Sequence, residues 1–144
     1  MLANRYFQSG RFEEAILQLE SALEKHPERH SARRKLVCCY LMIGRVADAV
    51  TGMTRLLDAA PRALRGVDPV DEGFPCTTSE EAMAKLSAGL TEGERHAACA
   101  LVRLLFWEPG AIAELDLASE ATPPLAAAGE LRRVLSAHPE THHV

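Results

Sequence analysis

The chain has 144 residues with a formal net charge of −4, and 47% of the residues are apolar while only 5% are aromatic. This length supports one domain with a real core, and an aromatic-poor composition rich in Ala and Leu favours helix over strand. The acidic excess lies after Pro61, which argues against nucleic-acid binding because that activity needs a basic footprint. No apolar run is long enough to cross a bilayer, so we expect neither a nucleic-acid nor a membrane partner.

The cysteines are Cys38, Cys39, Cys76 and Cys99, and none of them belongs to a C-x-x-C pair. Cys38 and Cys39 are adjacent in a predicted helix, where their side chains point in different directions and a disulfide between them would be strained. We therefore expect four free thiols in a reducing compartment, which predicts a cytoplasmic protein.

Three amphipathic helices are predicted before Pro61. In Phe12–Lys25 the apolar residues fall on one stripe and the acidic residues on the opposite face. His26-Pro27 ends this helix, because the residue before a proline resists the helical conformation. A second helix is predicted from about residue 29 to residue 42, and a third starts at Val46 with the same stripe as the first. Residues 2–9 read as the end of one more helix.

These helices repeat with a period of 34 residues. An aromatic residue, a glycine, an alanine and a proline recur at that spacing. The matching pairs are Tyr6 and Tyr40, Gly10 and Gly44, Ala15 and Ala49, and Pro27 and Pro61. The unit is helix, glycine turn, helix, proline turn, because glycine accepts the left-handed conformation that ends a helix.

This period and pattern resemble the tetratricopeptide repeat family. The resemblance implies an all-α fold of two tetratricopeptide-like hairpins over residues 1–61, the first truncated at its start, in a right-handed α-solenoid. The small residues of the family's helix crossing are matched by Ala15 and Ala49. Its Trp-Leu-Gly signature is not, since the second repeat has Arg33, Leu36 and Val37 there.

The rest of the chain divides into three parts. Residues 62–77 contain Pro, Gly and acidic residues without periodicity, which predicts a loop or linker. Residues 78–137 resume helical patterns, with T-x-x-E capping sequences starting at Thr78 and Thr91 and with Pro123-Pro124 expected to begin the last helix. They form either a degenerate third repeat with its turn at Gly110 or an unrelated C-terminal helical cap. Residues 138–144 are expected to be a flexible tail.

In the family, the first helix of each repeat lines a concave groove that holds partner proteins. The resemblance therefore implies a partner-binding groove lined by Asn4, Phe7, Gln8, Ser31, Arg34, Lys35, Cys38, Leu41 and Met42. The basic cluster over residues 29–35 predicts either a site for an acidic peptide or a solvated face that docks on the acidic second half. Phe7, Leu41 and Met42 are either apolar anchors for the partner or core residues. The carboxylate clamp of some family members is matched only at Asn4.

Catalysis and metal binding find little support. There is no Gly-rich phosphate loop, no H-E-x-x-H and no G-x-S-x-G. His96 and Cys99 lie one helical turn apart without a third orienting residue, and His138, His142 and His143 lie in the expected tail. We therefore expect neither an enzyme nor a metal or other cofactor.

The predicted function is a protein–protein interaction scaffold or adaptor whose concave groove binds a peptide or helix of a partner, with an acidic segment as one candidate. One alternative is a secretion-type or assembly chaperone that shields a client segment. A second is a fragment or regulatory module of a larger protein, an enzyme included, because the first repeat begins inside its first helix. An exposed terminal repeat also allows a homodimer.

Overall fold

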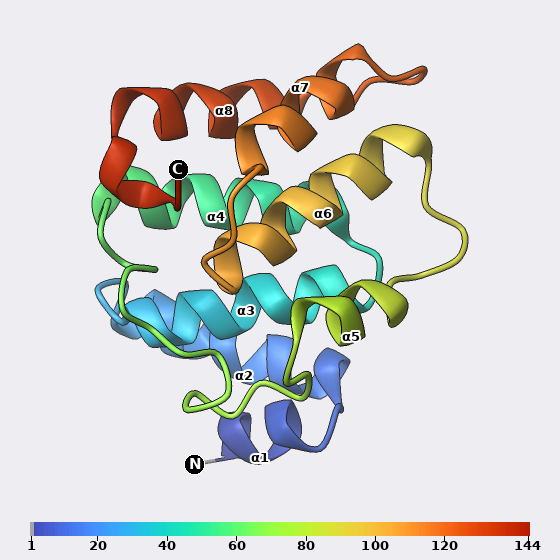
Figure 1. The fold of residues 1–144 in the computed structure, drawn as a ribbon. Helices are drawn as coiled ribbons and strands as arrows, with labels where there is room; N and C mark the ends of the chain where they lie inside the picture. Colours follow the sequence, from blue (N-terminus) through green and yellow to red (C-terminus); the bar gives the residue numbers. More distant parts are fainter. Residues whose placement is uncertain (1) are drawn as a thin grey trace.

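The computed structural model describes residues 2–144 and is all-helical over that range (Figure 1). The α-helices are α1 (Leu2–Gln8), α2 (Phe12–Lys25), α3 (His30–Met42), α4 (Val46–Ala59), α5 (Ser79–Ala84), α6 (Glu92–Leu105), α7 (Ala111–Glu120) and α8 (Ala127–Ala137), and a 3-10 helix, η1, spans Pro139–Thr141. None of the helices within residues 2–144 has the length and apolar character needed to cross a membrane.

The first four helices form the two predicted hairpins. Each hairpin turns on a glycine in the left-handed region, with φ of 77° at Gly10 and 85° at Gly44. The amide of the next residue then returns to the helix, as Arg11 donates to the Tyr6 carbonyl (2.8 Å) and Arg45 to the Tyr40 carbonyl (2.9 Å). Arg11 also places its guanidinium group over the Tyr6 ring, and Arg45 places its guanidinium group over the Tyr40 ring. The period of 34 residues is therefore reproduced in backbone and side chains alike.

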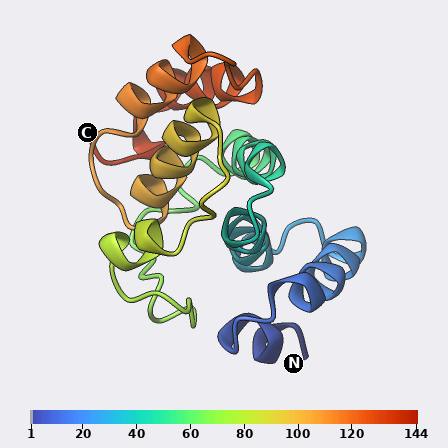
Figure 2. The same ribbon diagram turned by 90° about the vertical axis from the view of Figure 1, so that its right-hand side faces the viewer.

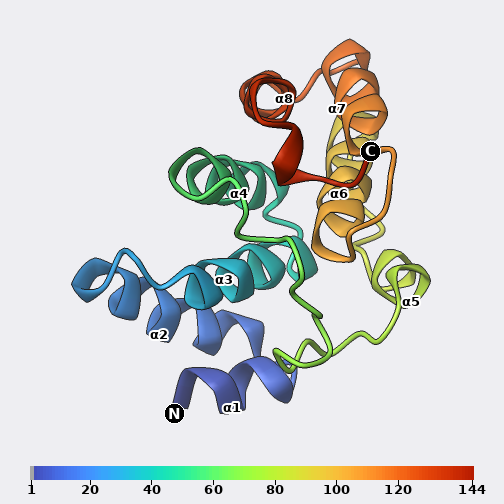
Figure 3. The same cartoon turned by 60° about the vertical axis from the view of Figure 1, so that its left-hand side comes forward.

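The small residues of the repeat lie in the core. Ala15 and Ala49 are both 0% exposed, in helices that pack against α1 and α3 respectively. A methyl group at these positions lets two helix backbones approach closely, as a stacked pair requires. The helices stack from α1 upward through α2 and α3 to α4, each packed on its neighbour in the chain (Figure 3). The all-α fold with tetratricopeptide-like hairpins is confirmed.

The last three long helices continue the stack. Helix α6 forms a hairpin with α7, while α8 packs against both α4 and α7 and covers the open side of the second repeat (Figure 2). Thr91 and Glu94 form the predicted capping box of α6. Thr78 caps α5, but the Glu81 carboxylate accepts from the backbone of Thr77 instead of closing the box. Helix α8 begins at Ala127, later than the predicted start at Pro123-Pro124.

The α6–α7 hairpin has the same kind of turn as the two repeats. This turn falls at a residue that the sequence pattern did not indicate. Trp107 has a φ of 55°, and the following amide, of Glu108, donates to the Arg103 carbonyl at 2.7 Å. Trp107 precedes Pro124 by 17 positions, the same spacing that separates Gly10 from Pro27 and Gly44 from Pro61. Gly110, which was expected to form the turn, instead precedes α7 as its N-cap.

The tail differs from the flexible segment that was expected. It contains η1, and Thr141 is 0% exposed. The Thr141 hydroxyl donates to the His138 carbonyl at 2.7 Å, which holds the turn. The tail therefore packs back on the helices instead of extending from them.

Candidate functional site

The face presented by α1 and α3 is the side on which the family resemblance places a groove, and we call it the inner face. Residues 62–76, which we call the covering segment, contain neither helix nor strand. They leave the end of α4, run across α3 to the end of α1 and then reach α5 (Figure 3). The predicted loop is therefore in place, and it lies over the predicted groove.

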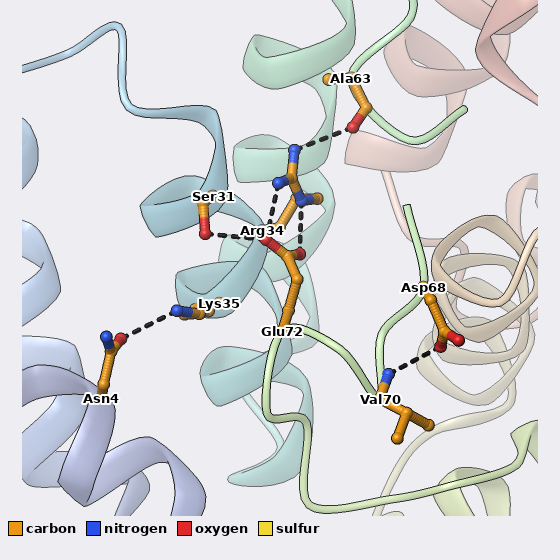
Figure 4. Close-up of polar contacts among 8 residues, drawn as sticks. All are labelled: Asn4, Ser31, Arg34, Lys35, Ala63, Asp68, Val70 and Glu72. Atoms are coloured by element: carbon orange, nitrogen blue, oxygen red, sulfur yellow. Dashed lines mark hydrogen bonds and ion pairs between the residues drawn. The ribbon is translucent and has the colours of Figure 1, made fainter. Parts of the chain in front are cut away.

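A paired charge fixes the covering segment to α3 (Figure 4). The Arg34 guanidinium donates through Nε and Nη2 to the two carboxylate oxygens of Glu72, at 2.6 and 2.7 Å. The Ser31 hydroxyl donates to the same carboxylate at 2.8 Å, and Arg34 Nη1 donates to the Ala63 carbonyl at 2.9 Å. Because the two charged side chains are only 12% and 13% exposed, solvent screens this two-bond grip weakly.

The electrostatics of Glu72 follow from this arrangement. Burial acts to raise its pKa, but hydrogen bonds from Arg34 and Ser31 and the charges of Arg34 and Lys35 oppose it. The net result is a pKa below the ordinary value of 4.5. Glu72 is therefore a carboxylate at neutral pH, and the inner face holds a carboxylate through cationic and hydroxyl donors.

An aromatic contact lies two residues further along. The Phe74 ring meets the Phe7 ring edge-on, with centroids 5.2 Å apart, and Phe7 is 0% exposed. Gly73 lies between the two anchoring side chains with a φ of 82°, and a Cβ on it would come within 2.8 Å of the Gln8 amide nitrogen. The left-handed backbone conformation favours glycine at this position, beside the Gln8 side chain of α1.

The predicted groove residues divide into buried and accessible sets. Phe7, Cys38 and Leu41 are 0%, 4% and 1% exposed, so in this structure they are core residues and not open anchors. Of the two alternatives given for Phe7 and Leu41, this burial favours core residues, and the Phe74 ring of the covering segment lies against Phe7. The accessible or half-buried members are Asn4, Gln8, Ser31, Arg34, Lys35 and Met42.

Two hollows remain beside the covering segment. The first, about 270 Å³, is lined by Ala3, Asn4, Leu19, Ala22, Arg29, His30, Ser31, Ala32 and Lys35. In it the Lys35 ammonium donates to the Asn4 side-chain oxygen at 2.8 Å. The second, about 390 Å³, is lined by Gln8, Ser9, Gly10, Phe12, Met42, Pro75 and Lys85. Of the predicted groove residues, Asn4, Ser31 and Lys35 line the first hollow and Gln8 and Met42 line the second, while Arg34 lines neither.

Sequence reasoning did not single out Glu72 and Phe74, which complete the inner face. They lie in "DEGFP", which reads only as a loop with an acidic character. The opposite charges of the two halves of the chain were the available signal, and they indicated docking of the basic cluster on acidic residues. Neither charge nor periodicity indicates which of several loop acids meets Arg34, because that choice depends on the path of the loop.

The other candidate chemistry is not assembled into a site. His96 Nδ1 lies 2.8 Å from Glu114, but burial raises the pKa of the Cys99 thiol, and the charge of Glu114 raises it further. A thiol with a raised pKa is a poor nucleophile at neutral pH. Cys38, Cys39, Cys76 and Cys99 are all free thiols. Within residues 2–144 no group of three His, Cys, Asp or Glu side chains is placed to hold a metal ion.

Comparison with protein families agrees with the geometry. Residues 1–63, which include both N-terminal hairpins, match the family model described as tetratricopeptide repeat. No curated protein and no solved structure matches the chain. Repeats of this kind generally mediate protein–protein interactions and are typically non-catalytic. The match ends at residue 63, the second residue of the covering segment, so it includes the repeats but neither Glu72 nor Phe74.

Proposed function

We propose that this protein is a cytoplasmic adaptor that recognises a segment of another protein on its inner face. The observation that carries the proposal is the grip of Arg34 and Ser31 on a carboxylate, at a place where a tetratricopeptide repeat presents its binding side chains. The proposal gives the chain no catalytic step and no cofactor. The partner supplies an acidic segment, since the cations of the face are Arg34, which already holds a carboxylate, and the half-buried Lys35.

Rigid presentation is the mechanism. Helix α3, which carries Ser31, Arg34 and Lys35, is held by a continuous core, so the donors are in position before a partner arrives. Binding then costs little ordering of this protein, and a few anchors give roughly micromolar affinity. A guanidinium that donates two parallel bonds also fixes the orientation of the bound carboxylate.

The chaperone alternative fits the face less well. A chaperone that shields an aggregation-prone client needs accessible apolar surface, whereas Phe7 and Leu41 are buried. The accessible side chains around Arg34 are polar or charged. We therefore favour selective recognition of an acidic segment over general shielding of apolar segments.

Site-specific photo-cross-linking tests the proposal. A photoreactive phenylalanine analogue is placed at position 42, in the hollow beside α1, and as the matched control at position 17 on α2. Leu17 is 70% exposed on α2, away from the inner face that α1 and α3 present. Both probes replace an apolar residue of a helix. Partners are captured from cells, identified and purified, and the cross-linking is then repeated with the purified pair.

We expect a purified partner to cross-link from position 42 and not from position 17. Cross-linking from position 17 alone would place recognition on the outer side of the hairpins and refute the proposal. A second measurement uses co-expression: an adaptor leaves the solubility of its partner unchanged, whereas partner aggregation in its absence would favour the chaperone alternative.

A further inference from the structure

We infer that the covering segment is a built-in competitor, and that a partner occupies the same place with a carboxylate two residues before an aromatic ring. This inference rests on the proposed function and names the chemistry of the partner segment. The partner is an acidic peptide with this spacing, and it binds after the middle of the covering segment has moved away from α1 and α3.

The covering segment is held as a bound peptide would be held. Glu72 and Phe74 point inward to Arg34 and Phe7, while their neighbours Val70 and Asp71 are exposed. One side chain supplies the charge, the other supplies the apolar contact, and Gly73 lets the backbone pass closely between them. The chain thereby displays which ligand chemistry the inner face accepts.

The middle of this segment can leave without dismantling a helix. Residues 62–76 contribute no turn to any α-helix, and their ends are fixed independently by Leu64 and Cys76, each 3% exposed. Between these two anchors, Glu72 bonds to Arg34 and Phe74 contacts Phe7, and Pro69 is also buried. Its release exposes Arg34 and the Phe7 ring and removes Phe74 from the buried cluster, whose other members lie mostly in the helices.

Competition by an attached segment has a predictable size. A tethered ligand acts at an effective concentration in the millimolar range, so it lowers the apparent affinity of an identical free ligand by roughly 10- to 1,000-fold. A natural partner therefore needs a contact that the covering segment lacks. Lys35 offers one, because its ammonium is bonded to the neutral side-chain oxygen of Asn4 and can exchange that acceptor for a partner carboxylate.

The test uses the full chain and a labelled peptide that copies residues 67–77, with serine in place of Cys76. Peptide binding is measured by fluorescence anisotropy for the wild type and for Glu72→Lys/Phe74→Ala, in which both anchors are lost. The matched control is Asp71→Lys/Val70→Ala, which makes a similar change at the exposed neighbours. A second peptide carries glutamine and alanine at the two anchor positions.

We expect Glu72→Lys/Phe74→Ala to bind the copied peptide at least about tenfold more tightly than the wild type or the control does. The second peptide should bind this variant at least about tenfold more weakly, because it lacks both anchors. Equal binding by all three proteins, or equal binding of both peptides, would overturn the inference. So would a dimer of the variant in light scattering without peptide binding, since the occupant would then be a second copy.

Helical circular dichroism accompanies each measurement. Should the double variant lose its helical signal, the milder Glu72→Gln is measured, with an expected gain in affinity of about threefold or more. Loss of helix in both variants would show that the segment is an irreplaceable part of the fold and would also overturn the inference. Cross-linking of a partner from position 42 without any peptide binding would leave the proposed function standing and remove only the competitor.

Discussion

Arg34 and Glu72 lie 38 positions apart in the chain and form the central contact of the inner face. An exposed ion pair contributes little, because water screens it and two long side chains must be ordered. This pair is only 12–13% exposed and shares its carboxylate with Ser31, so removing one partner leaves a poorly solvated charge. The contacts of Arg34 and Ser31 with Glu72 therefore decide whether the covering segment stays on the inner face.

Glu72→Gln should make this contribution visible through its pH dependence. Because the folded pKa of Glu72 lies below its ordinary value of 4.5, its stabilisation is fully present above that pH and is lost as the pH falls through the folded pKa. We expect the wild type to exceed Glu72→Gln in free energy of unfolding by about 1.5–3 kcal/mol near pH 7. Urea denaturation near pH 7 and at acidic pH should show this difference shrinking as the pH falls from 4.5 through the folded pKa.

Asp71→Asn is the matched control, because Asp71 is an exposed neighbour. It should change the free energy of unfolding by less than about 0.5 kcal/mol at either pH. A wild-type advantage over Glu72→Gln that stays constant with pH would mean that the Glu72 charge does not stabilise the fold.

At the scale of elements, the turn within each hairpin carries the repeat. The first two turns use glycine, while the third places Trp107 in the left-handed region at φ 55°. A side chain there costs roughly 1–2 kcal/mol relative to glycine, because Cβ approaches the following carbonyl. The α6–α7 hairpin retains this turn geometry. It differs from the first two hairpins after the turn, where Glu108-Pro109-Gly110 separates Trp107 from α7. The strain is offset by packing around the half-buried indole, which meets the His143 ring.

Comparing Trp107→Gly with Trp107→Ala isolates the backbone cost. Both variants lose the indole, so their difference reports the left-handed conformation alone. We expect the glycine variant to be more stable than the alanine variant by about 1 kcal/mol, measured by chemical denaturation. Ala113→Gly, at an exposed position inside α7, should give the opposite preference and cost about 1 kcal/mol. Equal stability of the two Trp107 variants would contradict the left-handed assignment.

At the scale of the whole molecule, one core joins the repeats to the C-terminal helices. Buried residues form a single cluster that runs from Ala3 to Leu135. Helix α8 completes it by packing on both α4 and α7, which covers a surface that the second repeat would otherwise leave open. The inner face is therefore supported by residues distant in sequence, and the chain should unfold as a unit.

Leu41→Ala tests this unity. Leu41 is 1% exposed in the second repeat, whereas Trp107, the single tryptophan, reports on the third hairpin. We expect the substitution to lower the free energy of unfolding by about 2–5 kcal/mol. The unfolding transitions followed by tryptophan fluorescence and by helical circular dichroism should shift by the same amount. Leu17→Ala, at a position 70% exposed, is the control and should have little effect. A fluorescence transition that stays unshifted would show that the repeats unfold separately from the C-terminal helices.

The bounds of most helices follow from local rules. The predicted bounds of α2 match the structure, and α3 begins one residue after the predicted start. Periodicity, glycine turns and prolines act within a few residues, so they are visible in the chain itself. The third turn was predicted at the wrong residue because Trp107 has no preference for the left-handed region, and only surrounding contacts hold it there.

The sequence by itself determined the helical hairpins, their period of 34 residues and the side of the repeats that carries Ser31, Arg34 and Lys35. These features depend on spacing along one helix or across one turn, where chain geometry fixes which residues are neighbours. Only the tertiary structure decided that Glu72 and Phe74 cover that side and that Phe7, Cys38 and Leu41 are closed to solvent. The path of a loop without periodicity is set by contacts between distant residues, and no local pattern records them.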